Sequence, residues 1–398
     1  MSLGLYISVP FCRTKCSYCN FASDVFSRAV FERYLSVISN AMESAEQTAG
    51  RMGGVFDRAL DSIYLGGGTP TILDVAQLRN LFVTISQNFQ LEAGAEITVE
   101  CAPGTLSEAV VEALVQCGVN RVSLGVQSFV DQEARAVGRL HSREVVLQEI
   151  QRLRAAGITN INVDLIAGLP HQTSESWGIS LKELIECAVP HASVYMLEVD
   201  EDSRLGRELI AGGTRYHAHH VPDEDLTAEL YTRACEKLEA AGIPQYEISN
   251  FARTGQESRH NLKYWTRQPY MGFGVDAHSM LPATDPLLDA VRFATPDSLE
   301  AHMAAVLPTR TPVAREAALE EEFFLGLRLN RGVDLREIGS KFGDSAMEHL
   351  SETIVELVQG GLLGLEGSVI RLTPAGRLLS NEVFERFLKP EVQPTTRR

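Results

Sequence analysis

The sequence lacks both a long apolar run and an excess of basic residues. No uninterrupted apolar stretch approaches the about 18 residues of a membrane-spanning helix. Its 36 lysines and arginines stand against 52 acidic residues, a net charge of −16, which argues against a broad nucleic-acid surface. The first residues also lack the charged and apolar regions of a secretory signal. We therefore expect a cytoplasmic protein that does not bind nucleic acid, with peripheral membrane contact left open.

Cysteine is scarce outside one short segment. Cys12, Cys16 and Cys19 lie within eight residues, directly after the apolar run Leu3–Val9, which predicts a strand. A closed zinc site needs four ligands, and no fourth Cys or His lies nearby. Three thiolates would instead leave one iron of a cubane iron–sulfur cluster open to a chelating ligand. A zinc loop or three unrelated buried cysteines are the alternatives. The other four cysteines are isolated and are predicted to be small core residues: Cys101, Cys117, Cys187 and Cys235.

Short apolar runs alternate with helical patterns up to about residue 200. Such alternation predicts right-handed βα units and a parallel sheet, and six units favour an open partial (β/α)6 barrel. The predicted strands are Leu3–Val9, Ser62–Leu65, Glu96–Glu100, Val122–Gly125, Ile161–Leu165 and Ser193–Leu197. Helices are predicted near 27–49, 74–88, 107–117, 142–156 and 174–187, several of them capped by Asp74, Ser107, Ser142 and Ser174.

Polar residues follow several of these predicted strands. Glu100, Gln127 and Asp164 lie at or just after strand ends, where (β/α) barrels build their active sites. The Gly66–Pro70 segment, Gly-Gly-Gly-Thr-Pro, follows the second strand and would allow close backbone approach to a ligand. These groups predict a site facing the cysteine loop.

Two further segments are ambiguous from the residues alone. His217, His219 and His220 lie in the irregular stretch 198–222, which is either a metal site or a solvated loop. A helix over 223–241 and a strand over 245–251 are predicted next. His260-Asn261-Leu262-Lys263-Tyr264-Trp265 then combines an imidazole with two large aromatic rings. It either binds a flat aromatic ligand, with His260 as an axial donor, or closes the open end of the barrel.

The C-terminal part is predicted to be a separate winged-helix-like unit. Pro308–Pro312 resembles a linker, and three helices near 316–327, 335–342 and 347–359 precede a two-stranded wing over 360–372. The candidate recognition helix carries Glu348, Glu352 and Glu356 but no Lys or Arg, so we expect a packing or lid role. The predicted divisions are 1–200 for the barrel, 201–307 for a barrel extension, 308–390 for this unit and 391–398 for a disordered tail.

Several motifs together resemble the radical S-adenosylmethionine (SAM) haem chaperone family, also known as oxygen-independent coproporphyrinogen III oxidase-like proteins. The resemblance covers nearly the whole chain. Its motifs are the CxxxCxxC loop of Cys12, the Gly66–Pro70 turn, Gly125–Phe129, Gly138–His141, Asp164–Pro170 and the HNxxYW segment of His260.

This resemblance implies a set of ligands for three cofactors. Cys12, Cys16 and Cys19 would hold a [4Fe–4S] cluster, and Tyr6, Gly67 and Glu100 would contact SAM. The motif residues His260, Asn261, Tyr264 and Trp265 would bind haem. By similarity to coproporphyrinogen dehydrogenase, a second SAM would be lined by Tyr18, Gly68, Thr69, Gln127, Arg139 and Asp164.

Two departures from the dehydrogenase favour a haem carrier. Phe21 stands where that enzyme has a further Cys, and only five residues precede Tyr6. The expected function is to deliver haem to haem-requiring, respiratory proteins. The alternative is radical decarboxylation of coproporphyrinogen III to protoporphyrinogen IX. The sequence leaves open whether SAM is cleaved, whether a second SAM binds, which protein accepts haem and whether the chain forms a homodimer. It also leaves His217, His219, His220 and His278 as rival haem ligands.

Overall fold

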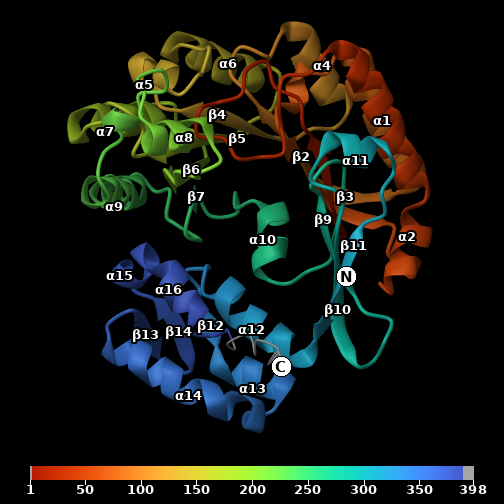
Figure 1. The fold of residues 1–398 in the computed structure, drawn as a ribbon, viewed down its shortest axis with the longest axis vertical. Helices are drawn as coiled ribbons and strands as arrows, with labels where there is room; N and C mark the ends of the chain where they lie inside the picture. Colours follow the sequence, from red (N-terminus) through yellow and green to blue (C-terminus); the bar gives the residue numbers. More distant parts are fainter. Residues whose placement is uncertain (1, 389–398) are drawn as a thin grey trace.

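An 11-stranded sheet organises the first 314 residues of the computed structural model, which describes residues 2–388. Its order is β11-β10-β9-β8-β1-β2-β3-β4-β5-β6-β7, and β1 to β6 pair in parallel. The sheet is open, which confirms the predicted partial barrel (Figure 1). The parallel strands are β1 (Leu3–Val9), β2 (Ala59–Gly67), β3 (Gln90–Cys101), β4 (Arg121–Gln127), β5 (Asn160–Ala167), β6 (His191–Met196) and β8 (Tyr270–Phe273).

Helices cover the outer face of the parallel strands. Capping boxes start α3 and α7, with Asp74 bonded to Gln77 and Thr173 bonded to Ser176. Thr173, not the predicted Ser174, is therefore the cap of α7. The helices of the barrel are α1 (Arg28–Glu43), α2 (Ala45–Met52), α3 (Val75–Asn88), α4 (Glu108–Gln116), α5 (Asp131–Ala136), α6 (Arg143–Ala155), α7 (Ser174–Glu186), α8 (Arg204–Ala211) and α9 (Glu224–Ala240).

Two predictions beyond residue 240 were wrong in detail. The expected strand over 245–251 is mostly a turn, and β7 covers only Asn250–Ala252. The expected linker forms β11 (Thr309–Ala314), which pairs antiparallel with β10 (Leu288–Ala294). Pro312 is tolerated there because β11 is an edge strand, where one backbone N–H can be lost. The antiparallel strand β9 (His278–Pro282), which the sequence patterns did not reveal, joins β8 to β10.

The C-terminal unit combines helices with a small sheet of order β12-β14-β13. This arrangement confirms the winged-helix-like expectation. Its elements are α12 (Arg315–Gly326), β12 (Val333–Asp334), α13 (Leu335–Phe342), α14 (Asp344–Gln359), β13 (Leu363–Glu366), β14 (Val369–Leu372), α15 (Pro374–Leu378) and α16 (Ser380–Glu385). The predicted tail lies outside the described residues.

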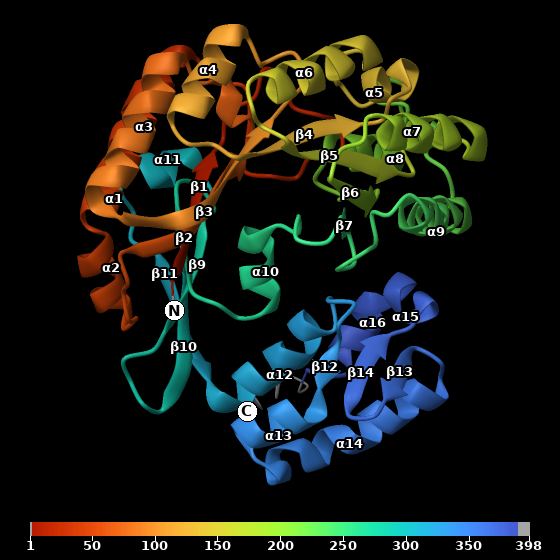
Figure 2. The same ribbon diagram turned by 180° about the vertical axis from the view of Figure 1, so that it is seen from behind.

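One buried arginine ties this unit to the sheet. The guanidinium of Arg267 lies within 2.8 Å of carboxylate oxygens of Asp289 and Glu321, and its side chain is only 3% exposed. The short helix α10 (Arg259–Trp265) lies between the barrel strands and the C-terminal unit (Figures 1 and 2). The predicted haem segment is therefore internal to the fold.

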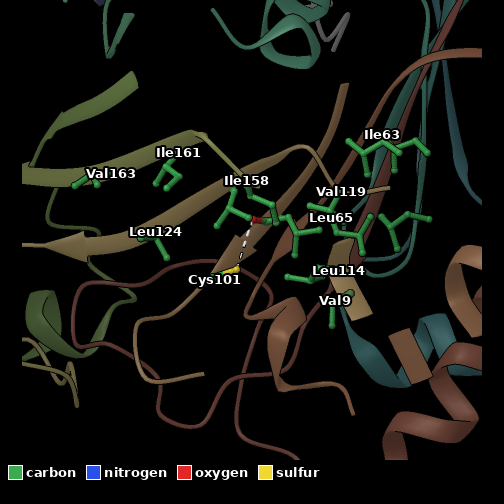
Figure 3. Packing of buried hydrophobic residues seen from close by; sticks show 14 of the residues in the cluster. Val9, Ile63, Leu65, Cys101, Leu114, Val119, Leu124, Ile158, Ile161 and Val163 are labelled. Atoms are coloured by element: carbon green, nitrogen blue, oxygen red, sulfur yellow. Dashed lines mark hydrogen bonds between the residues drawn. The ribbon is translucent and has the colours of Figure 1, made fainter. Parts of the chain in front are cut away.

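The main core lies between the parallel strands and their outer helices. Figure 3 shows Cys101 beside Leu65, Leu114 and Leu124, with its thiol directed at a backbone oxygen. This position agrees with its predicted role as a small core residue. Among residues 2–388, no helix has the length and apolar character to cross a membrane.

Candidate functional site

The cysteine loop leaves the carboxyl end of β1 and folds back on itself. Phe11 stacks on Phe31 of α1 with ring centroids 4.0 Å apart, which fixes the start of the loop. The Cys12 amide donates to Asp24 O at 3.0 Å. All three thiols are free, and burial, with smaller contributions from Cys16 and Cys19, raises the pKa of Cys12. The structure thus brings the three predicted cluster ligands together.

Their spacing discriminates between a cluster and a single ion. Zn–S bonds of 2.3 Å in a tetrahedral site would place thiolates about 3.8 Å apart. Within the described part of the chain, only a histidine group has three ligand atoms all within 4.8 Å of one another. The thiols of Cys12, Cys16 and Cys19 do not all meet that limit, which argues against a single zinc ion there.

Gly67, the last residue of β2, and Gly68 form the floor beneath the cysteine loop. A Cβ at Gly68 would lie 2.6 Å from Val9 O and 2.9 Å from the Phe11 backbone, so no larger residue fits. Gly67 has φ +93°, a conformation that favours glycine, and a Cβ there would meet Ser8 at 2.7 Å. The Thr69 hydroxyl points at Cys12 Sγ, 3.7 Å away. Gly67 and Gly68 are therefore packed closely against β1 and the start of the cysteine loop.

Glu100 lies at the end of β3, beside these glycines. The Tyr64 hydroxyl donates to Glu100 Oε1 at 2.8 Å. Burial, together with nearby Asp164, nevertheless raises the pKa of Glu100 to about 7. Asp164 on β5 accepts from Ser123 at 3.0 Å and from Asn162 at 2.7 Å, and burial raises its pKa as well. These carboxyl groups could receive hydroxyl and ammonium donors of a ligand.

A second group of predicted residues surrounds Tyr18 on the cysteine loop. Arg139 donates to the Tyr18 hydroxyl at 3.1 Å, while its buried Nε has no partner among the described residues. Gln127 lies close by, at an irregularity where β4 pairs with β5, and has φ +69°. A buried guanidinium with an unpaired N–H suits an anionic ligand group. The structure therefore brings Tyr18, Gln127 and Arg139 together.

The HNxxYW segment distributes its side chains over three environments. His260 is 1% exposed; its Nδ1 lies 3.0 Å from the Ser62 hydroxyl and its Nε2 2.9 Å from the Tyr264 hydroxyl. Burial, followed by the charges of Lys263 and Arg121, lowers the pKa of His260 to about 3. Ser62 of β2 and Tyr264 thus orient the imidazole, and Tyr264 can reach it because positions i and i+4 share a helix face.

Trp265 points away from this histidine. The Arg328 guanidinium of the C-terminal unit lies 4.5 Å from the Trp265 ring centroid. Tyr264, in contrast, lines a pocket of about 340 Å³, within the ordinary size range of ligand sites. The pocket is lined by Tyr6, Ser8, Phe21, Ala22, Gly67, Tyr264, Tyr270, Val275, Asp276 and His278.

This pocket joins two predicted sites that are far apart in sequence. Tyr6 and Gly67 belong to the predicted SAM site, and Tyr264 belongs to the predicted haem segment. Sequence analysis missed Ser8 and Tyr64, although Ser8 lies two residues after Tyr6 and so shares its face of β1. A polar hollow of about 400 Å³ near Arg13 and Arg152 contains none of the predicted site residues.

The fold and the cysteine site define a radical SAM protein. The family model described as "Radical SAM superfamily" matches residues 6–184, and "HemN C-terminal domain" matches residues 313–379. The chain is 34% identical to heme chaperone HemW of Bacillus subtilis over 96% of its length and 98% of that protein. It is 33% identical to heme chaperone HemW of Lactococcus lactis over 97% of both chains. The chain therefore belongs to the heme chaperone HemW family.

More distant relatives share the architecture. Bovine radical S-adenosyl methionine domain-containing protein 1, mitochondrial, is 33% identical over 83% of this chain and 74% of that one. The structure of coproporphyrinogen III oxidase (HemN) from Escherichia coli superposes with a TM-score of 0.82, at 24% identity, over 97% of this chain and 90% of that one. At this identity, the likeness to HemN supports the fold alone.

Proposed function

We propose that this chain is a cytoplasmic haem chaperone that carries a [4Fe–4S] cluster and SAM and delivers haem to haem-requiring respiratory proteins. The observation that carries the proposal is the pocket between the cysteine loop and α10. Its wall combines Tyr6 and Gly67 of the SAM site with Tyr264 of the HNxxYW motif. Haem bound there would lie beside the cluster site.

The cluster and SAM fit the residues that surround their sites. Cys12, Cys16 and Cys19 are free thiols on one loop, and Gly68 has no room for a side chain. When bound, the cluster would supply an open iron for the amino and carboxylate groups of SAM. Tyr6, Gly67 and Glu100 would position that ligand. The group of Tyr18, Gly68, Thr69, Gln127, Arg139 and Asp164 would serve a second SAM.

Haem binding would depend chiefly on the aromatic wall of the pocket. The Tyr264 ring packs edge-on against Tyr270, with centroids 4.6 Å apart, and Phe21 on the opposite loop is 66% exposed. An apolar macrocycle would remove the exposed Phe21 ring from water, at about 25 cal/mol per Å² of apolar surface. His260 lies behind Tyr264, bonded to its hydroxyl, so it would ligate iron only after that hydroxyl moves.

The charge of α14 bears on nucleic-acid binding, and the position of His278 bears on which histidine could bind haem iron. The exposed Glu348, Glu352 and Glu356 of α14 would repel phosphates, which supports the absence of nucleic-acid binding. His278 is exposed at the rim of the pocket, 3.5 Å from Asp276, and is the only one of the rival histidine ligands in its lining.

The experiment that tests the proposal compares two ligands under identical anaerobic conditions. Cluster-loaded protein is titrated with haem and, in parallel, incubated with coproporphyrinogen III, SAM and a reductant. We expect a saturable Soret band with haem and no formation of protoporphyrinogen IX. The exposed Phe21, where the dehydrogenase has a Cys, motivates the second expectation. Stoichiometric or greater protoporphyrinogen formation would refute the carrier and establish the dehydrogenase.

A further inference from the structure

Three histidines from two separate segments meet at the edge of the barrel. His171 lies in the turn after β5, whereas His217 and His220 lie in the segment between α8 and α9. One ring nitrogen of each lies within 4.8 Å of the others, and this is the only such group of potential ligands in residues 2–388. We propose that His171, His217 and His220 form a binding site for one divalent transition-metal ion, best suited to Zn²⁺.

The distance between two of the rings matches a shared ion. Nε2 of His171 lies 3.3 Å from Nδ1 of His217. Two nitrogens bound to one tetrahedral zinc at 2.0–2.1 Å would be about 3.3–3.4 Å apart. Because only one of two facing imidazole nitrogens can donate a proton, the pair could also form a hydrogen bond. That hydrogen bond does not involve His220. The presence of a third ring nitrogen, from His220, within 4.8 Å of the other two favours a metal.

Main-chain hydrogen bonds link the three histidine residues to one another without help from the ion. The His171 amide donates to His220 O at 2.9 Å, and the His220 amide donates to His217 O at 2.9 Å. His171 and His217 both have positive φ values, +68° and +59°, which are uncommon for residues other than glycine. These hydrogen bonds link the two segments and preorganise the ligands.

The chemistry of the ligand set indicates the kind of ion. Three neutral imidazoles suit zinc, copper or nickel rather than magnesium or calcium, which prefer oxygen. His220 is exposed, so a fourth position would remain accessible to water.

The position of the site suggests what the ion would do. Glu208 of α8 accepts from the amides of Tyr216 and Ala218, immediately beside the histidines. The same helix reaches the cysteine loop, because the Leu205 amide donates to Ser17 O at 2.8 Å. A bound ion would therefore brace the 198–222 segment that packs against the cysteine loop.

The test is a calorimetric titration of cluster-loaded protein, without a histidine tag, with ZnCl₂ in a non-chelating buffer. Loading the cluster occupies the cysteines and removes them as competing ligands. We expect one zinc per chain with a dissociation constant of about 1 μM or lower. His171→Asn, His217→Asn and His220→Ala should each weaken binding at least about tenfold. Asparagine is chosen at the first two positions because it tolerates positive φ.

His219→Ala is the matched control, because His219 is an exposed neighbour of the same loop outside the group of three. It should leave the zinc affinity within about twofold of the parent. Hydrogen exchange at residues 213–221 should also slow on addition of zinc in the parent and the control, but not in His171→Asn. Absence of stoichiometric zinc binding, or unchanged affinity in the three variants with their cluster content intact, would overturn the proposal.

Discussion

The two ends of the barrel strands carry similar polar side chains but differ in how these are partnered. At the amino-terminal end, Glu96 receives the His260 amide, and Lys263 pairs with Asp61 at 2.8 Å. At the carboxyl end, Arg139 keeps an unpaired buried Nε, and Glu100 has a raised pKa beside Asp164. The groups at the first end join α10 to the strands, although Asp61 Oδ1 there also lacks a hydrogen-bond partner, and the groups at the second end surround the predicted SAM site.

Tyr264 belongs to both regions. Its hydroxyl bonds to His260, whose amide donates to Glu96 at the first end, while its ring lines the pocket beside Tyr6 and Gly67. Within a single helical turn, the motif therefore has one residue, His260, that holds Tyr264 in place and another, Tyr264, that lines the pocket. Variants on either side of Tyr264 should behave differently.

The largest expected effect is loss of the predicted [4Fe–4S] cluster at the carboxyl end of the barrel strands. Cys12→Ala, Cys16→Ala and Cys19→Ala should each reduce iron and sulfide from about four per chain to near background, because each removes one of three ligands. Anaerobic iron and sulfide analysis measures this. Cys117→Ala, a half-buried cysteine outside the loop, is the control and should keep its full content. A full cluster in any of the first three variants would exclude that residue as a ligand.

The next largest effect is expected on SAM affinity, when Gly68 beneath the cysteine loop is replaced. Gly68→Ala would place a methyl group 2.6 Å from Val9 O, a contact that the backbone must move to relieve. We expect SAM affinity to fall at least about tenfold, since the loop beside the cluster would shift. Equilibrium dialysis with SAM gives the affinity. Gly50→Ala, whose added methyl meets nothing within 4 Å, should bind SAM like the parent. Equal affinity in both variants would show that the floor does not position SAM.

A smaller effect is expected on haem binding when His260, the partner of Tyr264, is replaced. His260→Ala removes the partner of the Tyr264 hydroxyl and should weaken haem binding by about tenfold and shift the Soret band. Iron and sulfide content should stay unchanged, because His260 lies away from the cysteine loop. His278→Ala is the comparison variant, since His278 is the other imidazole near the pocket. If only His278→Ala alters the spectrum, the motif histidine is structural and His278 is the ligand.

The smallest effect is a pH dependence at Glu100. Its pKa of about 7 means that the carboxylate, which would accept hydrogen bonds from SAM, predominates above pH 7 and is lost as pH falls below it. SAM affinity should decline about threefold from pH 7.5 to 6.5 by this ionisation. Glu100→Gln cannot ionise, so its weaker SAM binding should be flat over the same interval. Parallel profiles of the two proteins would assign the dependence to another group.

Local patterns predicted the elements best where they are long and self-contained. The strand Leu3–Val9 and the helix Leu335–Phe342 match their observed bounds, because their burial pattern and caps are encoded within the segment. The prediction failed at Pro308–Pro312, where prolines suggested a linker but a neighbouring strand made an edge of the sheet. Strand β9 also escaped notice, although its pairing partners β8 and β10 are its neighbours in the chain.

The sequence by itself determined the spacing of Cys12, Cys16 and Cys19, because three ligands on one short loop need no distant partner to converge. It also determined which strand ends would carry Glu100 and Gln127, since parallel strands align their carboxyl ends, whereas Asp164 lies inside β5, which continues to Ala167. Only the tertiary structure decided that Tyr264 shares a pocket with Tyr6 and Gly67 while Trp265 contacts the C-terminal unit. It also decided that His171 joins His217 and His220. Those contacts depend on how distant segments pack, and no local pattern specifies that packing.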